Sequence, residues 1–206
     1  MMKTAAILAS VLGSAAAFAP AQSAFKATTA LNAEKSPAVP FLPYPENLKG
    51  YIGDDIGFDP LRISDYFPMD YLRESEIKHG RICMLAIVGY ITTDLGIILH
   101  PYGAGLTSAT AHDALVEKGV MGNALVWIGG FEIVSWLAVS EMLQGSGREP
   151  GYFGFGTKFM EGKSAEDIKK LKYQEIMNGR LAMMAFGGAV TQSVLYDVGF
   201  PYIGSP

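Results

Sequence analysis

Three long apolar segments constrain this chain more than any other feature. They cover residues 82–99, 120–143 and 176–196. Each has about the ~20 residues that a helix needs to cross ~30 Å of hydrocarbon. The whole chain has 206 residues, of which 50% are hydrophobic and only 17% charged, and this composition is typical of an integral membrane protein. We therefore predict an all-α integral membrane protein with three transmembrane helices.

The distribution of Lys and Arg predicts the topology of these helices. Residues 34–81 and 144–174 carry six basic side chains each, whereas loop 100–119 has only Lys118 and the tail after Gln192 has none. Basic residues accumulate on the side that is not translocated, so the N-terminus and the second loop share one face. The net charge is −4 without a long basic run, and we therefore expect no nucleic-acid binding.

The first 33 residues read as targeting segments. Residues 1–17 combine Lys3, an apolar stretch and small residues, as a signal peptide does. Residues 18–33 have the composition of a transit peptide, because the first acidic residue of the chain is Glu34. Together they resemble the bipartite presequence of diatom and related plastids, with a plain secretory signal as the alternative. The membrane domain is then predicted to cover residues 34–206.

The first and third apolar segments are copies of one another. Residues 76–89 and 175–188, at an offset of 99, are identical at seven of fourteen positions. Upstream, Gly-Tyr-Ile-Gly at 50–53 echoes Gly-Tyr-Phe-Gly at 151–154. A duplication of this kind implies that the first and third helices form a pseudo-two-fold crossed pair.

Each copy places a glutamate and an arginine five residues apart, at or near the membrane. An unpaired charge there costs about 3 kcal/mol or more, and five residues is poor spacing for pairing within one helix. We therefore predict two reciprocal ion pairs between the helices, Glu76 with Arg180 and Glu175 with Arg81. Four glycines are predicted to allow close approach of the helices: Gly80, Gly89, Gly179 and Gly188.

A second polar side chain follows each of these glutamates by one turn. His79 in the first copy and Asn178 in the second are suitable axial ligands for a magnesium ion that is already held by four macrocycle nitrogens. Gln192, further along the third helix, and Glu132, the deepest acid of the middle segment, are further candidates. Two alternatives stay open: the ion pairs are only a structural clamp, and Gln192 makes a helix–helix hydrogen bond.

The hexapeptides Glu-Ile-Lys-His-Gly-Arg and Glu-Ile-Met-Asn-Gly-Arg resemble the repeated pattern of the light-harvesting chlorophyll-binding superfamily. Residues 57–61, Gly-Phe-Asp-Pro-Leu, look like the approach to the first helix in that family. Two ligand positions of green-plant relatives are missing: Ala124 stands where they have a glutamine, and the last histidine of the chain is His112. With the presequence, these departures make the chain resemble the fucoxanthin chlorophyll a/c-binding proteins of diatoms most. The resemblance implies six chlorophyll ligands, one backbone site that binds through water, and two arginines in the ion pairs: Glu76, His79, Glu132, Glu175, Asn178 and Gln192; Gly89; Arg81 and Arg180.

The resemblance also implies a function. The chain would bind chlorophyll a, chlorophyll c, fucoxanthin and related xanthophylls as a multi-pass protein of the plastid thylakoid membrane. It would pass excitation energy to a photosystem core and to neighbouring antenna subunits, with no catalytic residue. The third helix and tail resemble the red-alga-like branch of the family, and this resemblance gives a slight lean to photosystem I.

Three other functions stay open at this point. A stress-related member of the same family would dissipate excitation, although the loop 100–119 has only Asp113 and Glu117 as acids. A di-iron carboxylate enzyme also uses Glu-x-x-His, but the second copy has Asn178 and there are three helices in place of four. A purely structural assembly subunit would bind no chlorophyll.

Overall fold

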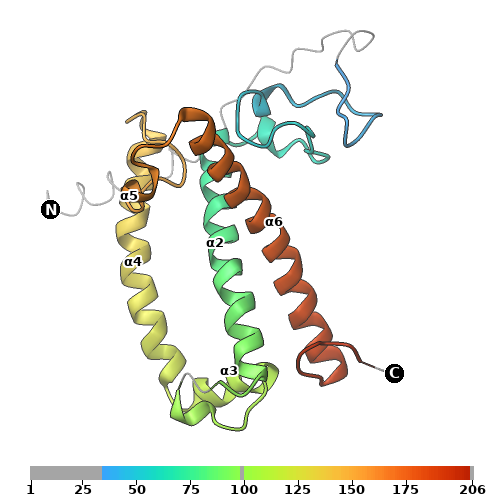
Figure 1. The fold of residues 1–206 in the computed structure, drawn as a ribbon, viewed down its shortest axis with the longest axis vertical. Helices are drawn as coiled ribbons and strands as arrows, with labels where there is room; N and C mark the ends of the chain where they lie inside the picture. Colours follow the sequence, from blue (N-terminus) through green and yellow to red (C-terminus); the bar gives the residue numbers. More distant parts are fainter. Residues whose placement is uncertain (1–33, 98–99, 205–206) are drawn as a thin grey trace, which may run out of the picture. The chain divides into compact units, whose positions relative to one another are not determined.

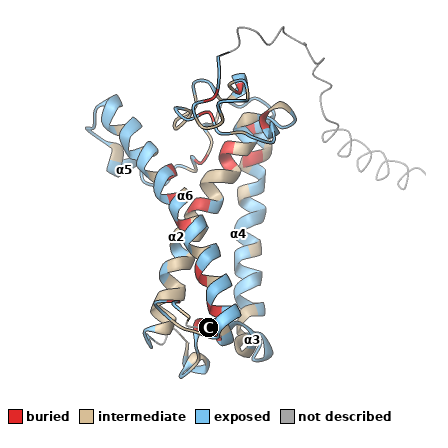
Figure 2. Cartoon of the chain, turned by 90° about the vertical axis from the view of Figure 1, so that its right-hand side faces the viewer, coloured by how far each residue is buried: buried red, intermediate tan, exposed pale blue. Residues whose placement is uncertain are grey.

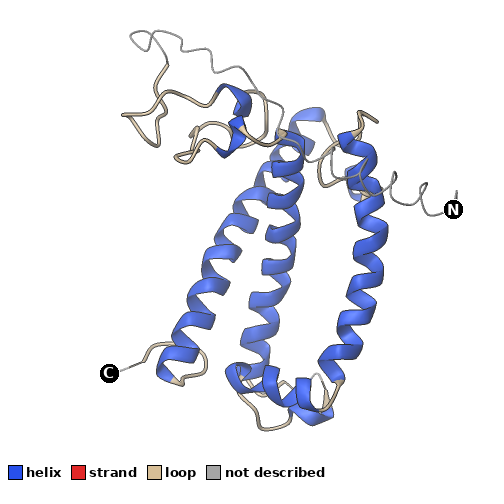
Figure 3. Cartoon of the chain, turned by 180° about the vertical axis from the view of Figure 1, so that it is seen from behind, coloured by secondary structure: helices blue, strands red, loops and turns tan. Residues whose placement is uncertain are grey.

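The computed structural model describes residues 34–97 and 100–204. The targeting segments that we predict at 1–17 and 18–33 lie outside these residues. The chain divides into two compact units, Met1–Met69 and Asp70–Pro206, and each is described by itself. The described part of the chain folds into helices and loops, without a strand (Figure 3).

The first unit is a loop region with two short 3-10 helices, η1 (Glu46–Leu48) and η2 (Ile63–Asp65). Asp59 fixes the start of η2, because its two carboxylate oxygens accept hydrogen bonds of 3.0 Å from the backbone N–H groups of Ile63 and Ser64. Burial alone would raise the pKa of Asp59. The hydrogen bonds from Ser64 and Ile63 outweigh it and hold the pKa below its ordinary value of 3.8.

The second unit contains the long helices. In chain order they are α2 (Met69–Asp94), η3 (Pro101–Gly103), α3 (Ser108–Glu117), α4 (Val120–Leu143), α5 (Thr157–Met160) and α6 (Ala165–Tyr196). Figure 1 shows that α2 and α6 run in the same direction and α4 in the opposite one, with α3 and the C-terminal segment at one end and α5 at the other. The α2–α3 loop and the second loop therefore lie at opposite ends of the unit.

Only α4 among the described helices is long and apolar enough to qualify as a membrane span by length and composition. The helices α2 and α6 do not pass this test, because polar and charged side chains continue beyond their first turns, as far as Arg81 and Asp94 in α2 and Arg180 and Gln192 in α6. The serine at the start of α6 caps that helix: Ser164 Oγ accepts from the Asp167 N–H at 3.1 Å. The three-crossing arrangement therefore stays a prediction.

Large apolar side chains are exposed along most of α4, with the half-exposed Glu132 as a polar exception. Trp127, Phe131 and Trp136 each expose more than 60% of their surface. Figure 2 shows exposed residues along most of α4, whereas buried ones gather where α2 and α6 meet. A helix that is hydrophobic on every side is stable in contact with lipid or other apolar groups, not with water.

The helices α2 and α6 cross at Gly80 and Gly179. A Cβ added at Gly80 would lie 2.9 Å from Gly179 Cα, and one added at Gly179 would lie 3.0 Å from Gly80 Cα. Our expectation for the other two glycines was wrong, because a Cβ at Gly89 or Gly188 meets nothing within 4 Å. Crossed helices are in close contact only near one point. Gly89 and Gly188 lie nine residues beyond that point, which is about 13 Å along each helix, and there the two helix axes have separated.

Polar contacts connect the C-terminal ends of α2 and α6. Tyr90 and Ser193 share a hydrogen bond of 2.5 Å between their hydroxyl groups. Asp94 accepts from the backbone N–H of Ser108 at 2.7 Å and from that of Phe200 at 3.2 Å, so one carboxylate holds both the start of α3 and the C-terminal segment.

The aromatic side chain at the centre of this end is Tyr202. It is 7% exposed, and its ring lies 5.7 Å from that of Tyr90. Burial and the neighbouring Asp94 raise the pKa of Tyr202 above its ordinary value of 10.0, so its phenol stays protonated.

Candidate functional site

Two reciprocal ion pairs join α2 to α6 beside the glycine crossing. Arg81 Nε donates to Glu175 Oε1 at 2.7 Å, and Arg180 Nε donates to Glu76 Oε1 at the same distance. The four side chains are between 27% and 41% exposed, so the pairs are half-buried. The duplicated hexapeptide thus builds two equivalent bridges, one on each side of the crossing.

The two bridges differ in their second partner, which sequence reasoning missed. Arg73 Nη1 lies 2.9 Å from Glu76 Oε2. Each oxygen of Glu76 therefore contacts a different arginine, Oε1 contacting Arg180 and Oε2 contacting Arg73. The equivalent residue of the second copy, Lys172, contacts Glu149 at 2.6 Å instead and leaves Glu175 with one cation. The signal was the position of Arg73, three residues before Glu76 on the same helix.

A buried carboxylate holds the second loop against α2. Glu74 is 3% exposed, and its Oε2 accepts from Gly151 N at 2.6 Å and from Arg148 Nη2 at 2.8 Å. Arg81 Nη1 donates to the carbonyl of Gly151 at 2.8 Å. The Gly-Tyr-Phe-Gly segment is therefore positioned by the same helix that carries the first hexapeptide.

The hydrogen bonding of His79 leaves one ring nitrogen available as a ligand. Its Nδ1 lies 2.8 Å from the carbonyl oxygen of Ser75. A carbonyl can only accept, so Nδ1 donates this hydrogen bond, and in the neutral ring Nε2 then keeps its lone pair. A hydrogen bond from the other ring nitrogen, here to the Ser75 carbonyl, is the usual way in which a protein orients a ligating histidine. The His79 side chain is also exposed.

The two amide candidates on α6 present their side chains outward. Asn178 and Gln192 are exposed, and neither side chain has a hydrogen-bond partner in the described part of the chain. An amide oxygen without an internal donor can serve as a metal ligand. The alternative of a helix–helix hydrogen bond for Gln192 therefore has no support within these residues.

Glu132 on α4 pairs with a cation that sequence reasoning did not assign to it. Lys78 Nζ donates to Glu132 Oε2 at 2.7 Å and to Ser135 Oγ at 2.6 Å. The Glu132 side chain is still 50% exposed, and its other oxygen keeps its lone pairs. The available signal was the repeat itself, because Lys78 stands where the second copy has Met177.

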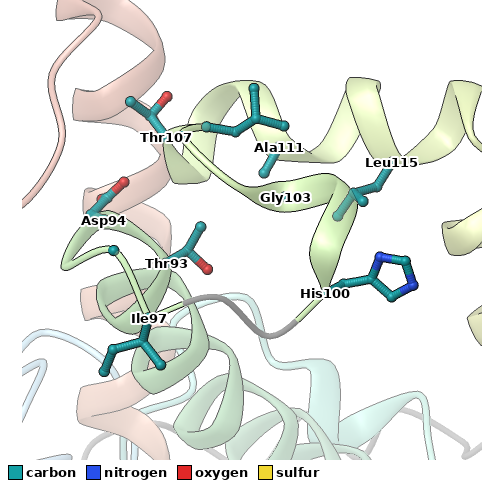
Figure 4. A pocket seen from close by; sticks show the side chains of 11 residues that line it. Thr93, Asp94, Ile97, His100, Gly103, Thr107, Ala111 and Leu115 are labelled. Atoms are coloured by element: carbon teal, nitrogen blue, oxygen red, sulfur yellow. The ribbon is translucent and has the colours of Figure 1, made fainter.

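A pocket of about 350 Å³ lies between the end of α2, η3 and α3 (Figure 4). Its polar groups are already engaged: Asp94 accepts from Ser108, and the Tyr102 N–H donates to His100 Nδ1 at 3.4 Å. The neutral His100 ring then carries its proton on Nε2, which cannot ligate a metal in that form. The pocket contains none of the ligands predicted from the sequence.

Most of the chain matches a known protein family. The model of the family described as "Chlorophyll A-B binding protein" matches residues 44–194. The chain belongs to this family. All the predicted ligand positions, from Glu76 to Gln192, lie inside the matched residues.

Individual relatives of this chlorophyll a-b binding family differ in their described roles. A fucoxanthin-chlorophyll a-c binding protein of Trieres chinensis is 33% identical over 92% of this chain and 94% of that protein. Light-harvesting complex stress-related protein 1 of Chlamydomonas reinhardtii is 31% identical over 75% of this chain and 67% of its own length. Photosystem I chlorophyll a/b-binding protein 3-1 of Arabidopsis thaliana is also 31% identical, over 75% of this chain and 68% of its length.

The donors present in this member of the chlorophyll a-b binding family fit a chlorophyll magnesium, which needs one axial ligand with a free lone pair. Carboxylate oxygens, a neutral imidazole nitrogen and amide oxygens all supply one. Gly89 is less open: its carbonyl already accepts from Thr92 Oγ1 and Thr93 Oγ1, both at 2.9 Å, and its role stays a prediction. No group of three or more His, Cys, Asp or Glu side chains in the described residues could hold a metal ion.

Proposed function

We propose that this chain is a light-harvesting antenna protein that binds chlorophylls and carotenoids and transfers excitation energy to a photosystem. One observation carries the proposal. Each hexapeptide has its glutamate bridged to the arginine of the other helix, and one turn later a polar side chain that is exposed and keeps a free lone pair. A structural clamp alone gives no reason for His79 to be oriented by Ser75.

The pigments that we propose are chlorophyll a, chlorophyll c, fucoxanthin and related xanthophylls. The name of the Trieres chinensis relative supports this set. Bound chlorophyll supplies light absorption and a magnesium ion that takes one axial ligand. The proposed axial ligands are spread over all three long helices: Glu76 and His79 on α2, Glu132 on α4, and Glu175, Asn178 and Gln192 on α6.

The chain's own residues bind and space the pigments and exclude water. Ion pairs fix the distance between α2 and α6, so ligands on the two helices are held at constant separation. The carboxylates reach a low-polarity surface without net charge, because each is paired with a cation from another helix. No bond is made or broken, and no catalytic side chain is needed.

We further propose that α2, α4 and α6 cross the plastid thylakoid membrane, with the second loop on the stromal side. The apolar surface of α4 supports this, as do the exposed Leu85 on α2 and Leu181 on α6. The same surfaces would contact neighbouring antenna subunits and a photosystem core. The name of the Arabidopsis relative supports photosystem I as that core.

The test is the absorption and fluorescence-excitation spectrum of the purified protein. We expect chlorophyll a and c bands, and carotenoid absorption that excites chlorophyll a emission. A colourless protein would overturn the antenna function and select a structural subunit. A colourless protein that contained iron would revive the di-iron enzyme.

A charge swap separates ligation from clamping. The double variant Arg81→Glu with Glu175→Arg keeps an ion pair between α2 and α6 but removes the carboxylate from position 175. We expect the loss of one chlorophyll per chain and a stability lowered by about 1 kcal/mol, because the swap keeps the ion pair but removes the hydrogen bond from Arg81 to the Gly151 carbonyl. Retention of every chlorophyll in the swapped protein would show that this pair is a clamp only.

A dissipative function is the second candidate, because of the similarity to a stress-related protein of Chlamydomonas reinhardtii. The two functions predict the same pigments but different excited-state lifetimes. A long chlorophyll a lifetime in the isolated protein at neutral and acidic pH fits the antenna. A strongly shortened lifetime, at either pH, fits the dissipative member.

A further inference from the structure

The middle helix α4 receives a cation from α2 at one place. Lys78 Nζ reaches across and donates to Glu132 Oε2 at 2.7 Å and to Ser135 Oγ at 2.6 Å. Glu132 and Ser135 are three residues apart, so they lie on the same face of α4. The lysine therefore bridges two adjacent groups of α4 and fixes the position of the carboxylate.

This contact breaks the internal symmetry of the chain. The residue equivalent to Lys78 in the second copy is Met177, although the flanking Glu, Ile, Gly and Arg are repeated. Figure 1 shows α2 between α4 and α6. Only the copy that lies next to α4 has a carboxylate of α4 within reach, and only that copy carries the lysine.

The geometry at Glu132 matches that of the bridge at Glu175. Glu175 uses one oxygen for the arginine of another helix, and Glu132 likewise uses one oxygen for the lysine of another helix. The remaining oxygen of Glu132 keeps its lone pairs, and the side chain is half exposed. An unpaired carboxylate on an apolar helix is costly, so the cation makes this ligand position neutral.

We propose that Lys78 is the counter-ion and positioning residue of a chlorophyll site at Glu132. The inference rests on the proposed function, since it concerns one ligand of that antenna. Without the ammonium group, the carboxylate loses both the charge that balances it and the contact that fixes its orientation. Arginine at position 78 can supply the same charge and at least one of the two hydrogen bonds.

The test uses the full chain reconstituted in detergent with chlorophyll a, chlorophyll c and fucoxanthin. The variants are Glu132→Ala, Lys78→Met, Lys78→Arg, and the double variant with Lys78→Met and Glu132→Ala. Lys170→Met is the matched control, because Lys170 is exposed on α6 and forms no ion pair in the described part of the chain. The readouts are chlorophyll per chain and the difference spectrum against the unsubstituted protein.

We expect Glu132→Ala to lose one chlorophyll and Lys78→Met to lose at least half of the same spectral band. The double variant should lose no more than Glu132→Ala alone, and both Lys78→Arg and Lys170→Met should retain the band. Loss spread in proportion over all bands in Lys78→Met would overturn the inference, because it indicates a structural role only.

The outcomes separate this inference from the antenna function. If Glu132→Ala loses a chlorophyll and Lys78→Met loses none, Lys78 is not the positioning residue and the antenna function stands. If Glu132→Ala loses none while the other sites remain filled, the site at Glu132 is refuted and the function again stands. Failure of the unsubstituted protein to bind any chlorophyll refutes the function itself.

Discussion

Glu74 and Glu149 show how differently two ion-paired carboxylates of the same chain are placed. The Glu74 side chain is 4% exposed and pairs with Arg148 at 2.8 Å, whereas the Glu149 side chain is 55% exposed and pairs with Lys172 at 2.6 Å. The two ion-pair distances are similar, so the pairs differ mainly in how far they are buried. A pair removed from water depends on both partners, while an exposed charge is stabilised by solvent when its partner is lost.

We therefore expect Glu74→Gln to lower the free energy of unfolding by about 3 kcal/mol, because Arg148, whose side chain is only 14% exposed, loses its carboxylate. Glu149→Gln should lower it by about 0–1 kcal/mol. Equilibrium unfolding of the two variants in the same detergent measures both. Equal losses would contradict the assignment of Glu74 as the side chain that holds the second loop.

Asp59 predicts a pH dependence of the first unit. Its pKa in the folded protein is held below 3.8, so its stabilising effect is present above that value and is lost as the pH falls through the lowered pKa. The variant Asp59→Asn has no ionised acceptor at this position at any pH. We expect its free energy of unfolding at neutral pH to be lower by about 1 kcal/mol.

Hydrogen exchange over residues 59–66 checks this, with the protein and the variant compared at each pH. We expect the unsubstituted protein to be better protected at about pH 7, and the difference to narrow as the pH falls below 3.8 and through the lowered pKa of Asp59. A protection ratio that does not change with pH would contradict the role of Asp59.

At the scale of elements, the crossing of α2 and α6 depends on the absence of two Cβ atoms. The contact at Gly80 and Gly179 is backbone against backbone, so no flexible side chain can move aside for a substituent. Gly89 is also in α2 but faces open space. The same substitution therefore has opposite consequences at the two positions.

We expect Gly80→Ala to reduce the thermal stability of the reconstituted protein by about 1–3 kcal/mol and to weaken both ion pairs. Gly89→Ala should be neutral or stabilising by up to about 1 kcal/mol, because alanine favours a helix and the backbone carbonyl is retained. Thermal denaturation followed by helical circular dichroism measures both. A larger loss for Gly89→Ala would place the crossing elsewhere along α2.

At the scale of the second unit, Asp94 connects three segments that are far apart in sequence. It ends α2, accepts from Ser108 at the start of α3, and accepts from Phe200 in the C-terminal segment, where Tyr202 is buried. Each hydrogen bond to a charged group contributes at most about 1.5–3 kcal/mol to the stability of the fold. Loss of this carboxylate should release the tail without unfolding the long helices.

The expected result for Asp94→Ala is a rise of about tenfold in the rate at which carboxypeptidase digests the tail, with unchanged helix content. Asp113→Ala is the matched control, because the Asp113 side chain is 92% exposed and, within the described residues, pairs only with its neighbour His112. Equal digestion rates for the two variants would show that Asp94 does not hold the tail.

The amino-acid sequence by itself determined the helical character, the duplication and the reciprocal partners of Glu76 and Glu175. The physical reason is that period, length and charge balance are properties of the chain, and a repeat allows few ways to pair four charges. The sequence could not reveal which helix lies beside which, or where two helices cross.

Only the tertiary structure decided the remaining features. Lys78 meets Glu132 because α2 lies next to α4, and Arg148 meets Glu74 because the second loop folds back onto α2. Gly80 is in contact while Gly89 is not, since two straight helices approach closely over one short stretch. Such contacts depend on distances between segments more than fifty residues apart, which no local pattern encodes.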